Sequence, residues 1–117
     1  IPEQIETCLP ERDRQTLADL QLRRILTDSS KEGLKQGVEG AAWEGLLYSK
    51  PWDFQLQRIK VPVHLWHGEQ DNVVPVSMGR YLAEHIPRCR SVFYPDDGHF
   101  SLPFNRMREI LGRLFQN

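Results

Sequence analysis

The stretch that decides the fold is Ile59-Lys-Val-Pro-Val-His-Leu-Trp-His-Gly-Glu-Gln-Asp-Asn-Val-Val-Pro75. It begins with an apolar, partly β-branched run over residues 61–66, which is typical of a buried strand of a parallel sheet. The run breaks at Gly68, and Asp71 follows in the loop that closes the stretch. The pattern therefore predicts a buried strand that presents a carboxylate just beyond its carboxyl end.

A second stretch, Val92-Phe-Tyr-Pro-Asp-Asp-Gly-His99, repeats this plan with a histidine as the presented group. Gly68 and Gly98 would permit a sharp exit from each strand. Since parallel strands about 4.8 Å apart end at one edge of a sheet, we expect Asp71 and His99 to meet there. An aspartate that accepts a hydrogen bond from one imidazole nitrogen leaves the other nitrogen to act as a base. The two residues are therefore candidates for the acid and the histidine of a catalytic triad.

The overall composition narrows the class of protein. The chain has 117 residues, enough for one domain, and a formal net charge of −1 without a long run of one sign. This charge balance argues against a nucleic-acid partner. No apolar run approaches the roughly 20 residues that span a bilayer. Residues 1–6 lack the features of a signal peptide, and the absence of an initiator methionine suggests a processed or truncated product.

The cysteines and histidines give no sign of a disulfide framework or a metal site. Cys8 and Cys89 lie far apart and form no C-x-x-C pattern, which is typical of free thiols in a reducing cytoplasm. His64 and His67 would point to opposite faces of a strand and could not share a metal. We therefore expect a cytoplasmic protein that needs neither metal nor cofactor and does not bind membranes.

Residues 1–58 are expected to be helical and loop-like. Apolar positions with helical spacing predict one helix over 11–28, ended by Asp28-Ser29-Ser30. A second helical stretch over 34–46 is interrupted by glycines, so we expect a kinked helix packed tightly on a neighbour. The loop that follows carries Trp52 and Phe54, which we expect to anchor it, and all three tryptophans are expected to be packed.

Residues 59–117 are expected to alternate strand and helix. A helix capped by Ser77 follows the first strand and stops at Pro87, and residues 88–91 form a turn. A short strand over 92–94 and an amphipathic helix starting near Phe104 complete the chain. This order predicts an α/β fold with a parallel sheet and a right-handed crossover.

Residues 51–102 closely resemble the C-terminal part of an α/β-hydrolase. In that family the pattern P-V-x-x-x-x-G-x-x-D-x-x-x-P carries the triad acid, and a G-H pair after the last strand carries the triad histidine. Matched residue by residue, the resemblance implies that Asp71 is the acid and His99 the general base. Residues 11–48 look like the cap and the element that precedes the acid strand in bacterial members.

The resemblance also implies a division of the chain. Residues 1–58 would form a helical cap-like segment with its connecting loop. Residues 59–117 would form the C-terminal βαβα part of the core, which in this family is a doubly wound, mostly parallel sheet. Asp71 and His99 would then both belong to the second part.

The chain departs from the family at the nucleophile. The family's serine precedes the acid in a G-x-S-x-G elbow, and no serine of this chain has glycine two residues away on both sides. The resemblance therefore implies the C-terminal portion of a serine hydrolase that lacks the nucleophile-bearing N-terminal half. Ser77 and Ser101 are expected to be helix caps. Without an elbow and oxyanion donors we expect the chain alone to be inactive, since removing one such donor costs roughly 10²–10³ in rate.

Two functions remain open. In the first, Asp71 orients His99, which activates a serine supplied elsewhere for hydrolysis of an ester- or amide-type bond in a small molecule. The alternative is a non-catalytic α/β fragment that self-associates or binds a partner, with Asp71 merely capping a turn, as Asp96 and Asp97 are expected to do. Because a sheet of two strands leaves an edge unpaired, we expect a homo-oligomer or association with the missing N-terminal half.

Overall fold

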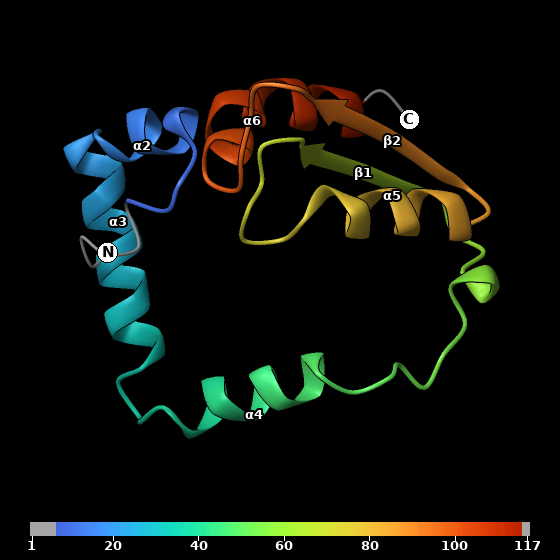
Figure 1. The fold of residues 1–117 in the computed structure, drawn as a ribbon, viewed down its shortest axis with the longest axis horizontal. Helices are drawn as coiled ribbons and strands as arrows, with labels where there is room; N and C mark the ends of the chain where they lie inside the picture. The colour runs from blue at the N-terminus through green and yellow to red at the C-terminus, as the bar shows by residue number, and fades with distance from the viewer. Residues whose placement is uncertain (1–6, 116–117) are drawn as a thin grey trace.

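A computed structural model describes residues 7–115 and contains a small α/β unit preceded by three helices (Figure 1). In chain order the elements are α2 (Glu11–Leu17), α3 (Leu20–Gly33), α4 (Glu39–Tyr48), the 3-10 helix η1 (Leu56–Arg58), β1 (Val63–Gly68), α5 (Val76–His85), β2 (Cys89–Tyr94) and α6 (Ser101–Leu114).

The two strands form a parallel sheet whose register determines where the loops meet. Val63 pairs with Cys89 at one end, and Gly68 pairs with Tyr94 at the other. Helix α5 connects the strands and packs on both of them, while α6 contacts β1 and lies on the other side of the sheet (Figure 1). Because both strands end at the same level, the loop after β1 and the loop after β2 leave the sheet side by side.

The bounds of the α/β elements differ from the predicted ones for local reasons. β1 starts at Val63 because Pro62 has no N–H to donate, and the first inter-strand bond runs from the Val63 N–H to the Arg88 carbonyl at 3.0 Å. β2 starts at Cys89, where a turn was predicted. The prediction of Ser77 as a cap is wrong, because α5 starts at Val76 and Pro75 holds the N-cap position.

The first predicted helix is two helices. Asp19 separates α2 from α3, and its Oδ1 accepts hydrogen bonds from the N–H groups of Gln21 (2.9 Å) and Leu22 (3.0 Å). This is the N-cap arrangement of a new helix. The predicted stop at residues 28–30 is wrong, because the Ser30 hydroxyl bonds back to the Leu26 carbonyl at 2.8 Å and α3 continues to Gly33.

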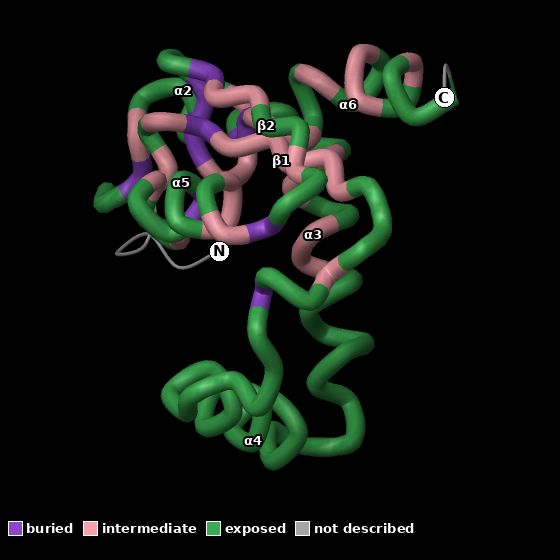
Figure 2. The backbone as a smooth tube through the Cα atoms, turned by 90° about the vertical axis from the view of Figure 1, so that its right-hand side faces the viewer, coloured by how far each residue is buried: buried purple, intermediate pink, exposed green. Residues whose placement is uncertain are grey.

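Helix α4 projects away from the rest of the molecule and is exposed along its whole length (Figure 2). The chain breaks before it at Gly37, whose φ is 115°, a conformation that glycine adopts readily. Open space lies next to Gly40 and Gly45. The predicted tight packing of this segment is therefore wrong, and Trp43 is 59% exposed.

The prediction that Trp52 and Phe54 anchor the loop after α4 to the body is wrong. Trp52 and Phe54 stack on each other with ring centroids 5.5 Å apart, but both rings remain exposed. Among the three tryptophans, Trp66 on β1 is partly covered, and its Nε1 atom is buried without a hydrogen-bond partner. The indole of Trp66 thus meets the expectation of a packed ring, whereas Trp43 and Trp52 do not.

The core of the described chain is small. Its buried apolar side chains are Leu9, Leu17, Leu56, Ile86 and Tyr94. The accessible surface of 8986 Å² exceeds the roughly 6,600 Å² of a compact protein of this mass. The radius of gyration of 16.1 Å likewise exceeds the roughly 13 Å of a compact domain. Within the described residues, no helix has both the length and the apolar character to cross a bilayer.

Candidate active site

Asp71 is held in the loop after β1 by bonds to both of its carboxylate oxygens. Its Oδ1 accepts hydrogen bonds from the N–H groups of Val73 (2.9 Å) and Val74 (2.8 Å). This local turn leaves Oδ2 pointing toward the neighbouring loop, and only 8% of the side chain is exposed. Asp71 therefore caps a turn and still presents one oxygen to a second group, so the two interpretations of this residue do not compete.

His99 is that second group. Its Nδ1 atom lies 3.0 Å from Oδ2 of Asp71. Because an ionised carboxylate can only accept, Nδ1 must carry the proton of this hydrogen bond. The ring is fixed further by an edge-on contact with Phe100, and 39% of the side chain is exposed. In this tautomer Nε2 is the unprotonated nitrogen, which is the atom a general base needs.

The two loops are joined by backbone bonds as well as by this pair. The N–H of Glu69 donates to the Tyr94 carbonyl at 2.8 Å, and the N–H of Gln70 donates to the Asp97 carbonyl at 3.0 Å. Gly68 lies so close to the second loop that a Cβ there would overlap the backbone of Asp97. Glycine is thus required at the end of β1 for close approach. A left-handed conformation is not the reason, because Gly37 is the only described residue with positive φ.

His67 lies beside Asp71, a neighbour that the sequence did not suggest. Its Nε2 atom is 2.9 Å from the Val74 carbonyl and 3.9 Å from Oδ2 of Asp71. A carbonyl accepts, so Nε2 carries a proton and donates it across the loop. Gly79 of α5 packs on the ring, since a Cβ at that position would come within 2.6 Å of Nδ1. His67 therefore braces the Asp71 loop through the Val74 carbonyl.

Asp97 anchors the histidine loop and is fully buried. It was expected to form a turn, but Arg106 donates from Nε to its Oδ2 at 2.7 Å, and Arg12 lies 3.8 Å from its Oδ1. The hydrogen bond to Asp97 raises the pKa of Arg106. Among the described residues, no three His, Cys, Asp or Glu side chains gather to form a metal site. Asp97 is thus part of an ion pair that ties the loop to α6.

Asp13 is a second fully buried acid, and sequence patterns gave no sign of it. It lies in α2, which packs against α6. Its carboxylate accepts hydrogen bonds from the backbone N–H groups of His99 and Ser101 and from the Ser101 hydroxyl. In the sequence, the charged run of residues 11–14 is typical of an exposed first turn of a helix. Only the tertiary packing turns one member of that run inward.

Ser77 and Ser101 do not complete the pair. Ser101 is fully buried, donates its hydroxyl proton to Asp13 (2.6 Å) and accepts from the N–H of Gly98 (2.7 Å). It stabilises the start of α6 from inside the helix, although Phe100 holds the N-cap position that was predicted for it. Ser77 is exposed on the first turn of α5. Neither serine stands at a strand-to-helix elbow.

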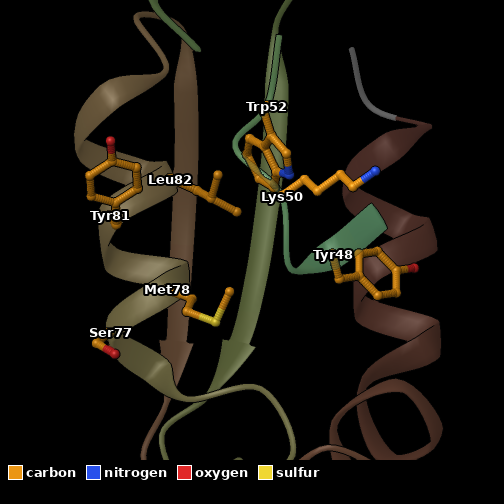
Figure 3. Close-up of a pocket in the computed structure, with 7 residues that line it drawn as sticks. All are labelled: Tyr48, Lys50, Trp52, Ser77, Met78, Tyr81 and Leu82. Atoms are coloured by element: carbon orange, nitrogen blue, oxygen red, sulfur yellow. The ribbon is translucent and has the colours of Figure 1, made fainter. Parts of the chain in front are cut away.

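A hollow of about 410 Å³ lies between α5 and the segment that follows α4. Its lining is mostly apolar and consists of Tyr48, Lys50, Trp52, Ser77, Met78, Tyr81 and Leu82. In Figure 3, Met78 and Leu82 extend from α5 toward Trp52, whereas Ser77 and Tyr81 point away from them. Neither Asp71 nor His99 belongs to this lining, so the hollow is separate from the pair.

Comparison with known proteins shows the family of the chain. The model of the alpha/beta hydrolase fold family matches residues 9–105. The chain belongs to the α/β-hydrolase fold family. The predicted α/β class is thereby confirmed, and the two parallel strands with their helices are a partial version of that fold.

Two similar proteins are esterases by name. The chain is 36% identical over 45 residues to pimeloyl-[acyl-carrier protein] methyl ester esterase of Nitrosomonas europaea, a match covering 38% of this chain and 18% of that protein. It is 35% identical over 71 residues to the bifunctional esterase/perhydrolase DCH of Acinetobacter calcoaceticus, covering 56% of this chain and 26% of that protein. The chain thus spans about a quarter or less of these relatives. No solved structure matches.

Proposed function

We propose that this chain supplies the acid and the histidine of an esterase-type α/β-hydrolase, and that the serine comes from a part of the fold outside these 117 residues. The observation that carries the proposal is the hydrogen bond of 3.0 Å between Asp71 and His99, two residues 28 positions apart on adjacent strand ends. Family membership and the two esterase relatives support the reaction class.

The proposed reaction is hydrolysis of an ester in two steps. Nε2 of His99 takes the proton of the serine hydroxyl while the serine oxygen attacks the ester carbonyl carbon. The bond from carbon to the alcohol oxygen breaks, and the alcohol leaves with the proton from Nε2. A water molecule then attacks the acyl-serine in the same way, and the acid and the free serine are released. Asp71 stabilises the imidazolium that forms in each step and keeps Nδ1 protonated.

The exposed apolar surface supports a contact with further protein. Large apolar side chains on the predicted apolar face of α6 remain exposed, including Phe104, Met107 and Leu111. The accessible surface exceeds that of a compact protein of this mass by about 2,400 Å². This excess is larger than the roughly 800 Å² that each partner buries in a standard interface. The serine-bearing part of the same fold would cover such a face and extend the two-stranded sheet.

The test is ester hydrolysis by the complete protein that contains this chain. We expect nitrophenyl acetate to be hydrolysed by that protein, and we expect His99→Ala and Asp71→Asn to lower kcat by about 10²–10⁴-fold, because general acid–base catalysis contributes that much. The 117 residues alone should not exceed the His99→Ala rate. Equal rates for the complete protein and its His99→Ala variant would exclude the proposal.

The uncovered apolar face also favours a second candidate, a non-catalytic module that self-associates or binds a partner. The two candidates differ in what covers α6. Light scattering of the 117 residues that shows a stable dimer, together with no hydrolysis by any longer form of the protein, would favour the module. A monomer that gains hydrolytic activity when the serine-bearing part is added would favour the esterase.

A further inference from the structure

One buried carboxylate outside the Asp71–His99 pair reaches the backbone of the histidine itself. Asp13 lies 86 positions before His99, on α2, and its Oδ2 accepts the backbone N–H of His99 at 2.9 Å. Its Oδ1 accepts the backbone N–H of Ser101 at 2.8 Å and the Ser101 hydroxyl at 2.6 Å. The side chain has no exposed surface. Three donors from one loop thus converge on a single carboxylate.

The loop is shaped to receive this carboxylate. A Cβ at Gly98 would lie 2.5 Å from Oδ2 of Asp13, so a larger residue could not stand between the acid and the backbone. The Gly98 N–H donates to the Ser101 hydroxyl at 2.7 Å, which turns that hydroxyl toward Asp13. Residues 98–101 are therefore folded around Asp13, and the bonds run through the residue that carries the imidazole.

We propose that Asp13 is a positioning residue for His99, acting through the backbone of the histidine loop. This inference rests on the proposed function for its effect on catalysis. Asp71 holds the imidazole ring at Nδ1, while Asp13 holds the peptide from which the side chain starts. With the ring and the backbone both held, Nε2 keeps a constant place relative to the serine that it serves.

An isosteric change isolates this role. In Asp13→Asn the amide presents one acceptor and one donor, so one of its ends must face an N–H group of the loop, either that of His99 or that of Ser101. The volume of the side chain is kept and only the hydrogen-bond pattern is broken. A displacement of the catalytic group by about 1 Å can cost about 10²-fold in rate. We therefore expect kcat to fall about 10²-fold while KM stays within about twofold.

Leu17→Ala is the matched control. Leu17 is buried one turn further along α2, so the variant weakens the packing of the same helix but keeps the carboxylate of Asp13 in place. The experiment measures kcat and KM for nitrophenyl acetate with the complete protein and both variants, well below their melting temperatures. It also records the low-field proton NMR signal of the Nδ1–H bond between His99 and Asp71, which does not depend on turnover.

The proposal is upheld if Asp13→Asn lowers kcat and shifts or removes the Nδ1 proton signal while Leu17→Ala lowers only the melting temperature. It is overturned if Asp13→Asn keeps the wild-type kcat and signal, or if both variants lose them equally. If His99→Ala leaves the wild-type rate unchanged, the proposed function fails, and the NMR signal alone decides the role of Asp13.

A measurement without substitution covers the case in which Asp13→Asn does not fold. Hydrogen exchange of the unsubstituted protein should show the His99 amide protected to a similar degree as the Ser101 amide, since both donate to the same buried carboxylate. Free exchange at His99 beside a protected Ser101 would overturn the proposal.

Discussion

Gly68→Ala tests whether the close approach of the two loops holds the candidate site together. The added methyl group would overlap the Asp97 carbonyl oxygen, lie 2.5 Å from its carbon and lie 2.9 Å from the Gly98 carbonyl oxygen. All three atoms belong to the backbone and cannot move aside as a flexible side chain can. The loops must therefore separate by roughly 1–1.5 Å to restore ordinary van der Waals contact of about 3.5 Å with all three atoms.

The cost of this separation follows from the bonds that it breaks. The bond of 3.0 Å from the Gln70 N–H to the Asp97 carbonyl would be lost, at about 0.5–1.5 kcal/mol. Overpacking adds about 1–3 kcal/mol. We expect Gly68→Ala to lower the free energy of unfolding by about 2–4 kcal/mol. The Asp71–His99 bond of 3.0 Å would lengthen beyond hydrogen-bonding distance as the loops part.

Urea unfolding followed by circular dichroism measures the first effect, and Gly45→Ala provides the control. Gly45 lies within α4 with open space around it, so the same substitution there should stabilise the helix by about 0.5–1 kcal/mol. The two substitutions should therefore move the unfolding midpoint in opposite directions. If Gly68→Ala unfolds at the same urea concentration as Gly45→Ala, the tight contact between the loops does not exist.

Three further predictions concern the groups around the sheet. Burial, followed by the hydrogen bond to Glu109, raises the pKa of Tyr94. The contribution of Tyr94 to stability is therefore present below pH of about 10 and is lost as the pH rises through its pKa in the folded protein. In Glu109→Gln the phenolate absorbance should appear at lower pH, and an unchanged titration would contradict this. Burial raises the pKa of Cys89, so in a Cys8→Ser background its thiol should react with a disulfide reagent more slowly in the folded than in the unfolded protein, and equal rates would refute the assignment. Asp97→Asn should lower the free energy of unfolding by about 1.5–3 kcal/mol through loss of its charged bond to an arginine, and a melting temperature equal to that of the wild type would count against that ion pair.

The parts of the fold that depend on local pattern could be predicted from the sequence. An apolar run ended by a glycine predicts a strand and its carboxyl end, and two such runs joined by an amphipathic helix predict parallel pairing. Asp71 and His99 follow directly from that topology, because parallel strands in register deliver their loops to one edge. The meeting of Asp71 and His99 could therefore be predicted without knowing how the helices pack.

The errors lie where long-range packing or single capping groups decide the outcome. One side chain, Asp19, divides a continuous helical pattern into α2 and α3. The burial of Asp13 depends on the packing of α2 against α6, almost ninety positions away, and a charged first turn gives no sign of which acid turns inward. The segment around α4 was expected to pack tightly because glycines interrupt it, yet α4 is exposed along its whole length and has open space beside Gly40 and Gly45.

The central claim is that Asp71 and His99 activate a serine that lies outside this chain. A fluorophosphonate reports this directly, because an activated serine displaces its fluoride and forms a stable phosphonate ester. Mass spectrometry of the labelled complete protein should place the adduct on a serine outside the 117 residues, and His99→Ala should slow labelling by about 10²–10⁴-fold. Labelling at Ser77 or Ser101, or labelling at the same rate without His99, would contradict the account.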